Sequence, residues 1–282
     1  RGWSAAYVTM ALCLCATMLA TLWADEPAHR GAEEQRRMDA EMVDAVMGRP
    51  MHLDARPFWQ RHLLGAVVCP LLEFLKRYGC FAVVVLIFIG VFRLSDIAMG
   101  VMANPFYLDL GYSKSEIASV AKVFGFLMTI GGAALCGVLV IRLGIFRPLL
   151  LGAVLVASTN LLFSALAVYG DGQTPALVWL ALVISADNLS GGIASTAFIA
   201  YLSSLTNRSY TATQYALFSS LMTLPGKFIS GFSGIVVDGA GYPAFFAVAA
   251  ALGLPAILLV PVIMRRATPV AAPPAAEPRP AS

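Results

Sequence analysis

Seven apolar runs, each long enough to cross a lipid bilayer, restrict the fold of this chain more than any other feature of its sequence. A membrane-spanning helix needs about 20 consecutive, mainly apolar residues. The runs cover residues 3–23, 80–103, 117–141, 148–168, 176–205, 213–237 and 244–264. Because backbone polar groups must be paired within the chain when lipid surrounds them, such runs form helices. The sequence therefore predicts an all-α polytopic membrane protein with seven transmembrane helices.

Composition excludes the main competing classes. Of the 282 residues, 59% are hydrophobic and 12% are charged, whereas soluble domains carry about 25% charged residues. A net charge of +3 provides no basic patch for a nucleic acid. The first apolar run has no basic segment before it and no small-residue cleavage site after it, so we interpret it as a membrane span rather than a signal peptide.

The polar parts of the chain define its organisation. Between the first two spans, residues 33–47 could form a short surface helix, and residues 62–78 have the amphipathic pattern of an interfacial helix. A Pro/Ala-rich segment at the end is typical of disorder. The predicted segments are a first span (1–24), a central loop with its interfacial helix (25–78), a six-helix bundle (79–266) and a disordered tail (267–282).

Orientation follows from the distribution of Lys and Arg, which favour cytoplasmic loops. One set of loops holds nearly all of the basic residues outside the spans: Arg30, Arg36, Arg37, Arg49, Arg56, Arg61, Lys76, Arg77, Arg142, Arg147, Arg208, Arg265 and Arg266. The opposite set holds Lys114 and little else that is basic. We therefore predict that the central loop and the C-terminus are cytoplasmic.

Five charged residues lie inside predicted spans: Arg93, Asp96, Lys122, Asp187 and Lys227. Each costs about 2.5–3.5 kcal/mol near the centre of a membrane helix, so each requires a reason. Counting along the helices places Arg93, Asp187 and Lys227 at the midplane, with Asp96 and Lys122 one turn outward. Arg93 and Asp96 are also spaced i,i+3 and can pair on one helix face. A polar pathway that carries protons is one explanation; static ion pairs, with Lys122 reaching to the interface, are the other.

The order of features repeats along the last six spans. Spans two to four contain an acid with a base, a base, and no charge, whereas spans five to seven contain an acid, a base, and no charge. Gly137 and Gly144 are seven residues apart, as are Gly234 and Gly241. This order predicts a three-plus-three inverted repeat, the organisation of one half of many secondary transporters.

Small and polar residues accompany the buried charges. Gly191 and Gly192 follow Asp187, and Pro225 with Gly226 precedes Lys227. Such residues favour either close helix packing or a hinge. Ser158, Thr159 and Asn160 are expected to form hydrogen bonds between helices.

Three segments carry a resemblance to a known family. The loop from Gly137 to Arg147 resembles the loop motif of the major facilitator superfamily, although Ile141 stands where that motif has an aspartate. Residues 187–202 are similar to the tenth helix of muropeptide permeases of the AmpG type, and residues 207–217 to the following loop and eleventh helix. The sequence Arg93-Leu-Ser-Asp96 fits the seventh helix of that family.

The resemblance covers roughly residues 1–265 and implies that the chain is helix six, the central loop and helices seven to twelve of such a permease. Five further helices are then expected before Arg1, and the missing N-terminal half is an expected partner. The implied activity is proton-coupled import of N-acetylglucosaminyl-1,6-anhydro-N-acetylmuramyl peptides through the bacterial inner membrane. This import serves peptidoglycan recycling and, in some bacteria, β-lactamase induction.

The resemblance also suggests a role for each candidate residue. Asp96 and Asp187 are the proton-coupling candidates. Substrate binding is assigned to Arg93, Lys122, Asn188, Gln214 and Lys227. The gating loop would contain Gly137, Arg142, Gly144 and Arg147, and hinge or packing roles go to Gly191, Gly192, Pro225 and Gly226. The expected partners are membrane lipid and a small glycopeptide, with no nucleic acid.

Other functions remain open at this stage. Acetyl-CoA transporters of the endoplasmic reticulum share part of the pattern, and a non-transporting membrane fragment would use the charges only for helix assembly. An intramembrane enzyme is disfavoured because the three histidines, His29, His52 and His62, all lie outside the spans. They also lack the spacing of metal ligands, so no metal or organic cofactor is expected, and the proton gradient is the expected energy source.

Overall fold

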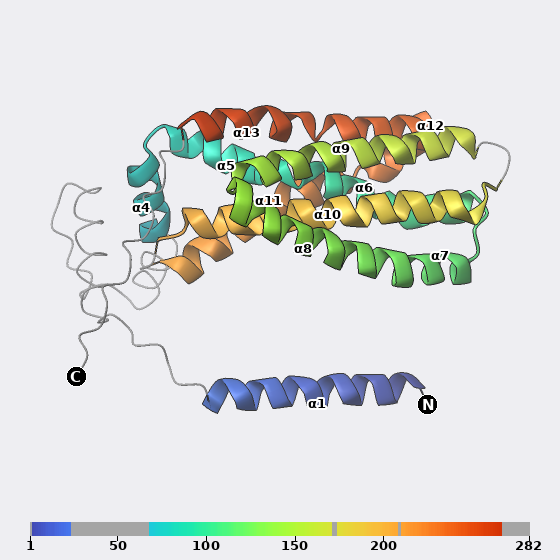
Figure 1. Cartoon of the computed structure of the whole chain (residues 1–282), viewed down its shortest axis with the longest axis horizontal. Helices are drawn as coiled ribbons and strands as arrows, with labels where there is room; N and C mark the ends of the chain where they lie inside the picture. Colours follow the sequence, from blue (N-terminus) through green and yellow to red (C-terminus); the bar gives the residue numbers. More distant parts are fainter. Residues whose placement is uncertain (1, 24–67, 171–173, 208–209, 267–282) are drawn as a thin grey trace. The chain divides into compact units, whose positions relative to one another are not determined.

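The computed structural model describes residues 2–23, 68–170, 174–207 and 210–266, which divide between two compact units, residues 1–62 and 63–282 (Figure 1). In the first unit, helix α1 covers Gly2–Trp23. Its apolar stretch, Ala5–Trp23, has no residue buried within the chain. The helix expected at 33–47, the three histidines and the C-terminal tail lie outside the described residues.

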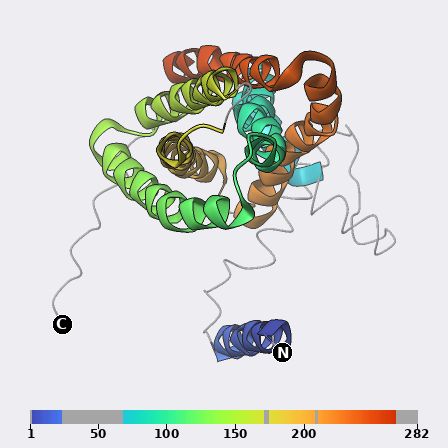
Figure 2. The same ribbon diagram turned by 90° about the vertical axis from the view of Figure 1, so that its right-hand side faces the viewer.

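In the second unit, helices run side by side along one long axis, and α4 lies across one end of them (Figures 1 and 2). Every regular element among the described residues is helical. The elements in chain order are α4 (Cys69–Tyr78), α5 (Phe81–Phe92), α6 (Leu94–Asp109), α7 (Lys114–Val120), the π-helix η3 (Ala121–Gly125), α8 (Phe126–Leu143), α9 (Phe146–Tyr169), α10 (Leu177–Leu205), α11 (Thr211–Ser230), α12 (Ser233–Ala251) and α13 (Leu254–Arg266).

Six helical segments of the described chain are long and apolar enough to cross a membrane: Ala5–Trp23, Phe81–Asp109, Lys114–Leu143, Phe146–Tyr169, Leu177–Leu205 and Ser233–Arg266. The all-α polytopic fold is confirmed. The predicted run 213–237 is not a separate member of this set, because α11 ends at Ser230 and carries several polar residues. Its last residues fall in the 34-residue segment Ser233–Arg266, whose helical path is broken at Gly241.

The second predicted span differs from expectation at two points. Its predicted end at Asn104-Pro105 is wrong, because α6 continues through Pro105 to Asp109. A proline removes one backbone donor, and membrane helices accommodate this loss through neighbouring groups. The same span is interrupted at Arg93, whose φ of −94° and ψ of 2° separate α5 from α6.

Two glycines of the predicted repeat share one backbone conformation. Gly144 ends α8 with φ 76° and ψ 178°, and Gly241 interrupts α12 with φ 77° and ψ 168°. Positive φ values are accessible mainly to glycine. The shared conformation supports the predicted correspondence between the third and sixth spans.

Helix α10 packs closely against α8 through glycines on both helices. A side-chain carbon on Gly132 would clash with the Leu189 carbonyl oxygen, and one on Gly192 would clash with the Thr129 carbonyl oxygen. A side-chain carbon on Gly191 would meet no heavy atom within 4 Å. The structure thus places Gly192, and not its neighbour Gly191, at the close backbone contact.

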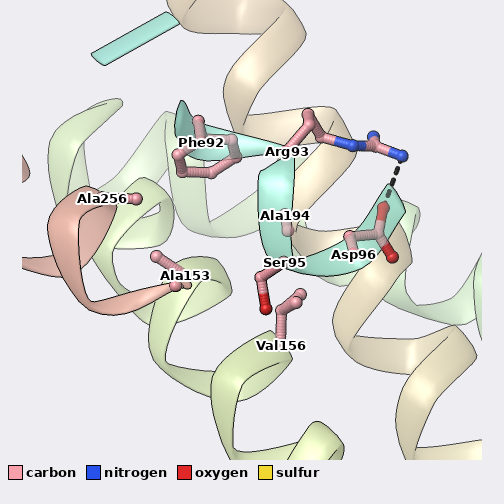
Figure 3. A pocket seen from close by; sticks show the side chains of 9 residues that line it. Phe92, Arg93, Ser95, Asp96, Ala153, Val156, Ala194 and Ala256 are labelled. Carbon is pink, nitrogen blue, oxygen red and sulfur yellow. Dashed lines mark ion pairs between the residues drawn. The ribbon is translucent and has the colours of Figure 1, made fainter. Parts of the chain in front are cut away.

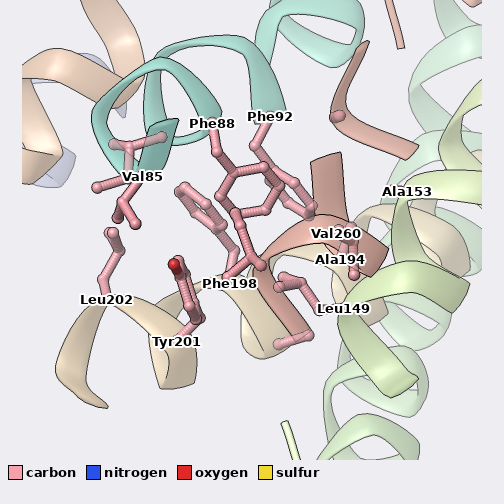
Figure 4. Close-up of a cluster of buried hydrophobic side chains, with 14 of the residues drawn as sticks. Val85, Phe88, Phe92, Leu149, Ala153, Ala194, Phe198, Tyr201, Leu202 and Val260 are labelled. Carbon is pink, nitrogen blue, oxygen red and sulfur yellow. The ribbon is translucent and has the colours of Figure 1, made fainter. Parts of the chain in front are cut away.

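The buried apolar residues form two clusters that lie at different levels along the bundle. The first contains Phe88, Phe92 and Phe198, and the Phe92 and Phe198 rings stack with centroids 4.3 Å apart (Figure 4). The second contains Phe106 and Phe163. On α9, α10 and the α5–α6 segment, residues of one cluster are separated from residues of the other by polar positions. These positions form the candidate site.

Candidate functional site

A layer of polar side chains lies between the two apolar clusters. We call it the polar layer, and its members are Arg93, Ser95 and Asp96 at the start of α6, Thr159 and Asn160 on α9, and Asp187 and Ser190 on α10. Because each set lies near the middle of its span (Phe81–Asp109, Phe146–Tyr169 and Leu177–Leu205), the layer is flanked by apolar packing on both sides. A mid-helix position of this kind requires internal partners for the polar groups.

Arg93 is the centre of the polar layer. Its Nη2 forms an ion pair with Oδ2 of Asp96 at 2.6 Å, and its Nη1 donates a hydrogen bond to Oγ of Ser195 on α10, also at 2.6 Å. The Arg93 and Asp96 side chains keep 27% and 25% of their surface exposed. The pairing predicted from the i,i+3 spacing is therefore present. Arg93 Nε is buried without a hydrogen-bond partner.

A pocket opens beside this ion pair. Figure 3 shows Arg93 and Asp96 facing each other, with Phe92 and Ala256 on the other side of the pocket. The volume of this cavity is about 10 Å³, room for about one water molecule. The lining residues are Phe92, Arg93, Ser95, Asp96, Ala153, Val156, Ala194, Gly253 and Ala256. The pocket is thus apolar except at Arg93, Ser95 and Asp96.

Hydrogen bonds between helices hold the layer together. Asn160 Nδ2 donates to Ser95 Oγ at 2.7 Å, and Ser95 Oγ donates to the Ala249 carbonyl at 2.7 Å. Thr159 Oγ1 lies 3.4 Å from Ser190 Oγ. The prediction of interhelical bonds is confirmed for Asn160 and Thr159. It is wrong for Ser158, whose hydroxyl donates to the Val154 carbonyl of its own helix because that acceptor is one turn away.

Asp187 has no oppositely charged partner among the described residues, where the ion pairs within 4 Å are Arg93–Asp96 and Arg77–Glu73. Thr159 Oγ1 donates to Asp187 Oδ1 at 3.5 Å. Asp187 is close enough to Asp96 for the two carboxylates to interact electrostatically. The structure therefore brings the two predicted proton-coupling residues into one region, with Arg93 paired to Asp96.

The other predicted substrate-binding residues are spread over several helices. Lys227 is exposed on α11, next to Gly226, which packs against Ile97. Asn188 Nδ2 donates to the Ile184 carbonyl, and Asn188 Oδ1 accepts from Thr129. Lys122 is exposed on the π-helix and lines a separate hollow between α6 and α7.

Gln214 belongs to a second network at one end of the bundle. We call it the α4 network, and it comprises Glu73, Arg77, Asn207 and Gln214. Gln214 Nε2 donates to Glu73 Oε2 at 2.6 Å and to the Pro70 carbonyl at 3.0 Å, and Gln214 Oε1 accepts from the Asn207 N–H at 2.7 Å. Asn207 Nδ2 also donates to Glu73 Oε1 at 2.8 Å. The sequence alone did not indicate these contacts.

Arg77 completes the α4 network. Arg77 donates to the Leu205 carbonyl and lies 3.5 Å from Glu73 Oε1 through its Nε. The neighbouring Tyr78 is half-buried, and burial raises the pKa of its hydroxyl above the usual value. The network therefore fastens α4 to the α10–α11 connection.

The predicted gating-loop residues surround the α8–α9 turn. Arg142 and Arg147 are both exposed. Gly144 donates its N–H to the Val140 carbonyl and ends α8. Phe146 follows the turn and contacts Tyr201 of α10 with ring centroids 5.9 Å apart. The α8–α9 turn therefore lies beside the C-terminal part of α10, which also carries the α4 network.

The fold and the polar layer define a multi-pass helical membrane protein with a partly buried charged centre. The sequence profile of the Major Facilitator Superfamily matches residues 1–229, and the chain belongs to this superfamily. The chain is 33% identical over 197 residues to the putative transporter AmpG 4 of Rickettsia conorii, a match that covers 70% of this chain and 46% of the relative.

Two further relatives match most of the chain. An uncharacterized protein of Haemophilus influenzae is 32% identical over 261 residues, covering 91% of this chain and 56% of the relative. The anhydromuropeptide permease of Escherichia coli K12 is 29% identical over 260 residues, covering 92% and 46% respectively. The chain spans about half the length of the curated relatives it matches.

Proposed function

We propose that the protein containing this chain is a proton-coupled secondary transporter that imports anhydro-muropeptides through the bacterial inner membrane for peptidoglycan recycling. The observation that carries the proposal is the Arg93–Asp96 ion pair, which lines a pocket whose apolar wall belongs to the first cluster. Ionisable groups at such depth mark substrate or proton pathways. The similarity to a relative named anhydromuropeptide permease supports this choice of substrate.

The geometry around Arg93 suggests how coupling works. An ionised Asp96 holds the Arg93 guanidinium by a charge-assisted contact, the stronger kind of hydrogen bond. A proton on Asp96 removes that charge and frees the guanidinium to hold a carboxylate of the substrate. The partnerless Nε provides one more donor. Asp187, which interacts with Asp96, is the second proton carrier in this proposal.

Orientation in the proposal follows the Lys and Arg distribution. The α4 network, the α8–α9 turn and the end of α13 lie at one end of the second unit (Figure 1). The guanidinium of Arg266 lies over the Phe81 ring, 5.6 Å from its centroid, which joins the end of α13 to the start of α5. Among the described residues, these parts carry Lys76, Arg77, Arg142, Arg147, Arg265 and Arg266, whereas the opposite end has Lys114, so this end is proposed to be cytoplasmic.

The test uses the full-length transporter in membrane vesicles with an imposed pH gradient and labelled anhydro-muropeptide. Hydrogen bonds to charged groups contribute about 1.5–3 kcal/mol, so Asp96→Asn and Asp187→Asn are each expected to lower gradient-driven uptake about 10- to 100-fold. Exchange of internal for external substrate without a gradient should persist, because it needs no net proton movement.

A matched control is available on the same helix as Asp96. Asp109 lies at the far end of α6 and accepts a hydrogen bond from Tyr242 at 2.5 Å. The Asp109→Asn variant changes the same chemical group outside the polar layer and should retain gradient-driven uptake. Unchanged uptake in Asp96→Asn, with normal protein levels, would refute the proposed coupling.

A further inference from the structure

A second pocket lies between α6 and the segment formed by α7 and the π-helix. Its lining residues are Asn104, Leu108, Lys114, Ile117, Ala118, Ala121 and Lys122, and its empty space, including the opening to solvent, is about 890 Å³. We call it the lysine pocket. It shares no lining residue with the pocket beside Arg93. The lysine pocket is therefore separate from the pocket beside Arg93.

The α7 side of the lysine pocket is one continuous helix face. Its five lining residues begin at Lys114 and follow at positions i+3, i+4, i+7 and i+8, the spacing of side chains on one side of a helix. Lys114 and Lys122 therefore lie on the same wall. Asn104 adds an amide from the opposite wall, one turn before Leu108 on α6.

The two lysines have no acidic partner among the described residues. The nearest acids along the chain are already used. Glu116 Oε2 accepts hydrogen bonds from the N–H of Ser113 at 2.8 Å and from its hydroxyl at 2.6 Å, which caps α7. Asp109 accepts the Tyr242 hydroxyl. The lysine pocket thus keeps two positive charges that its own helices leave uncompensated.

The π-helix places Lys122 within a backbone that is fixed from the other side. Gly125, the last residue of η3, packs against the Asn188 side chain of α10. Thr129 Oγ1 bonds both the Gly125 carbonyl and Asn188 Oδ1. Single π-turns inside α-helices are frequent at functional sites. Lys122 is therefore held in place by its backbone while its side chain stays exposed in the pocket.

We propose that the lysine pocket binds carboxylates of the ligand's peptide part, with Lys114 and Lys122 holding the negative charges and Asn104 donating a further hydrogen bond. The inference rests on the proposed function, because it assigns the peptide of a muropeptide to this pocket. Leu108 and Ile117 offer apolar contact to aliphatic groups between the carboxylates. Arg93 then binds the one substrate carboxylate that takes part in the coupling step with Asp96.

The experiment compares two substrates in vesicles that contain the full-length transporter. One is an anhydro-muropeptide with a tripeptide, and the other is the same anhydro-disaccharide without a peptide. Lys114→Gln with Lys122→Gln should raise the KM for the peptide-bearing substrate about tenfold or more and leave kcat nearly unchanged. The KM for the disaccharide should not change. Lys114→Arg with Lys122→Arg should restore most of the affinity, since the charges return.

The control and the contrary outcomes separate this proposal from the proposed function. Lys76→Gln removes an exposed ammonium on α4, outside the pocket, and should change neither KM. A KM change that is equal for both substrates, or no change, would overturn the proposal. If the unmodified transporter moves neither substrate, the proposed function fails. Calorimetry with citrate then decides for the pocket: binding that the double Gln variant weakens about tenfold supports it, and equal or undetectable binding overturns it.

Discussion

The α4 network and the polar layer both bury charged side chains, yet they differ in how completely those groups are paired. In the α4 network, the amide oxygen and nitrogen of Gln214 are both bonded, and both carboxylate oxygens of Glu73 accept hydrogen bonds. In the polar layer, Arg93 Nε and Asn160 Oδ1 are buried without partners. A fully paired network makes a structure rigid, whereas unpaired buried groups indicate a place for a ligand or water.

The accompanying space differs in the same direction. A cavity of about 10 Å³, room for about one water molecule, adjoins Arg93 and Asp96. Gln214 is only 1% exposed and is enclosed by α4 and the α10–α11 connection. A polar residue within an apolar chain is therefore not by itself evidence of a binding site. Incomplete pairing together with open space is the better criterion.

Substitution of Gly192 is expected to damage the polar layer and the α4 network together. Helix α10 carries Ser195, which accepts a hydrogen bond from Arg93, and leads into Asn207 of the α4 network. In Gly192→Ala, the new carbon would clash with the Thr129 carbonyl of α8. Such overpacking is expected to cost about 3 kcal/mol of unfolding free energy. The unfolding temperature in detergent and the rate of uptake into vesicles should both fall.

The adjacent glycine provides the matched control for that substitution. Gly191→Ala places its carbon where no heavy atom lies within 4 Å, so stability and uptake should stay close to the original values. Equal effects of the two alanines would contradict the packing described for α8 and α10.

Substitution of Gln214 is expected to weaken the α4 network alone. Gln214→Leu leaves a Glu73 carboxylate oxygen and the Asn207 N–H without their present partners, at a cost of about 2 kcal/mol. Uptake per folded molecule should be unchanged, because the residue lies outside the polar layer. Unfolding in detergent measures the loss of stability, and uptake divided by the amount of folded protein measures activity per folded molecule.

A control on the same helix limits the interpretation. Ser220 is bonded to the Ala216 carbonyl of its own helix, so Ser220→Ala should affect neither measurement. Loss of uptake in Gln214→Leu at normal stability would instead support the substrate-binding role that the family resemblance suggests for this residue.

Substitution of Ser195 is expected to weaken the polar layer alone, through its contact with Arg93. Ser195→Ala removes one acceptor from Arg93 and should lower uptake about fivefold, equivalent to about 1 kcal/mol, with little change in stability. Ser204, farther along α10, donates to the Tyr201 carbonyl of its own helix. Ser204→Ala should leave uptake intact, and an equal loss in both variants would show that Ser195 has no special link to Arg93.

The sequence predicted those features that depend on short spacing. Run length identified membrane helices, and the i,i+3 spacing predicted the Arg93–Asp96 pair. Gly144 and Gly241 were paired from their spacing, and they share one backbone conformation. Each of these features is decided within a few residues, where helix geometry alone fixes the outcome.

Features that depend on distant partners could not be predicted from one sequence. Gln214 and Glu73 are separated by 141 residues, and Arg93 and Ser195 by 102, so no local pattern relates them. The Asn104-Pro105 pair predicted the end of a helix, but Pro105 lies within α6. The π-helix at Ala121–Gly125 likewise had no sequence signal that we recognised.

The break at Arg93 places one residue at the meeting point of three segments. The Arg93 N–H points to the Val91 carbonyl, two residues back, where the regular hydrogen-bond pattern of the span Phe81–Asp109 is interrupted. The Arg93 side chain contacts Asp96 on α6 and Ser195 on α10. One arginine therefore marks the boundary between α5 and α6 and links that boundary to a third helix.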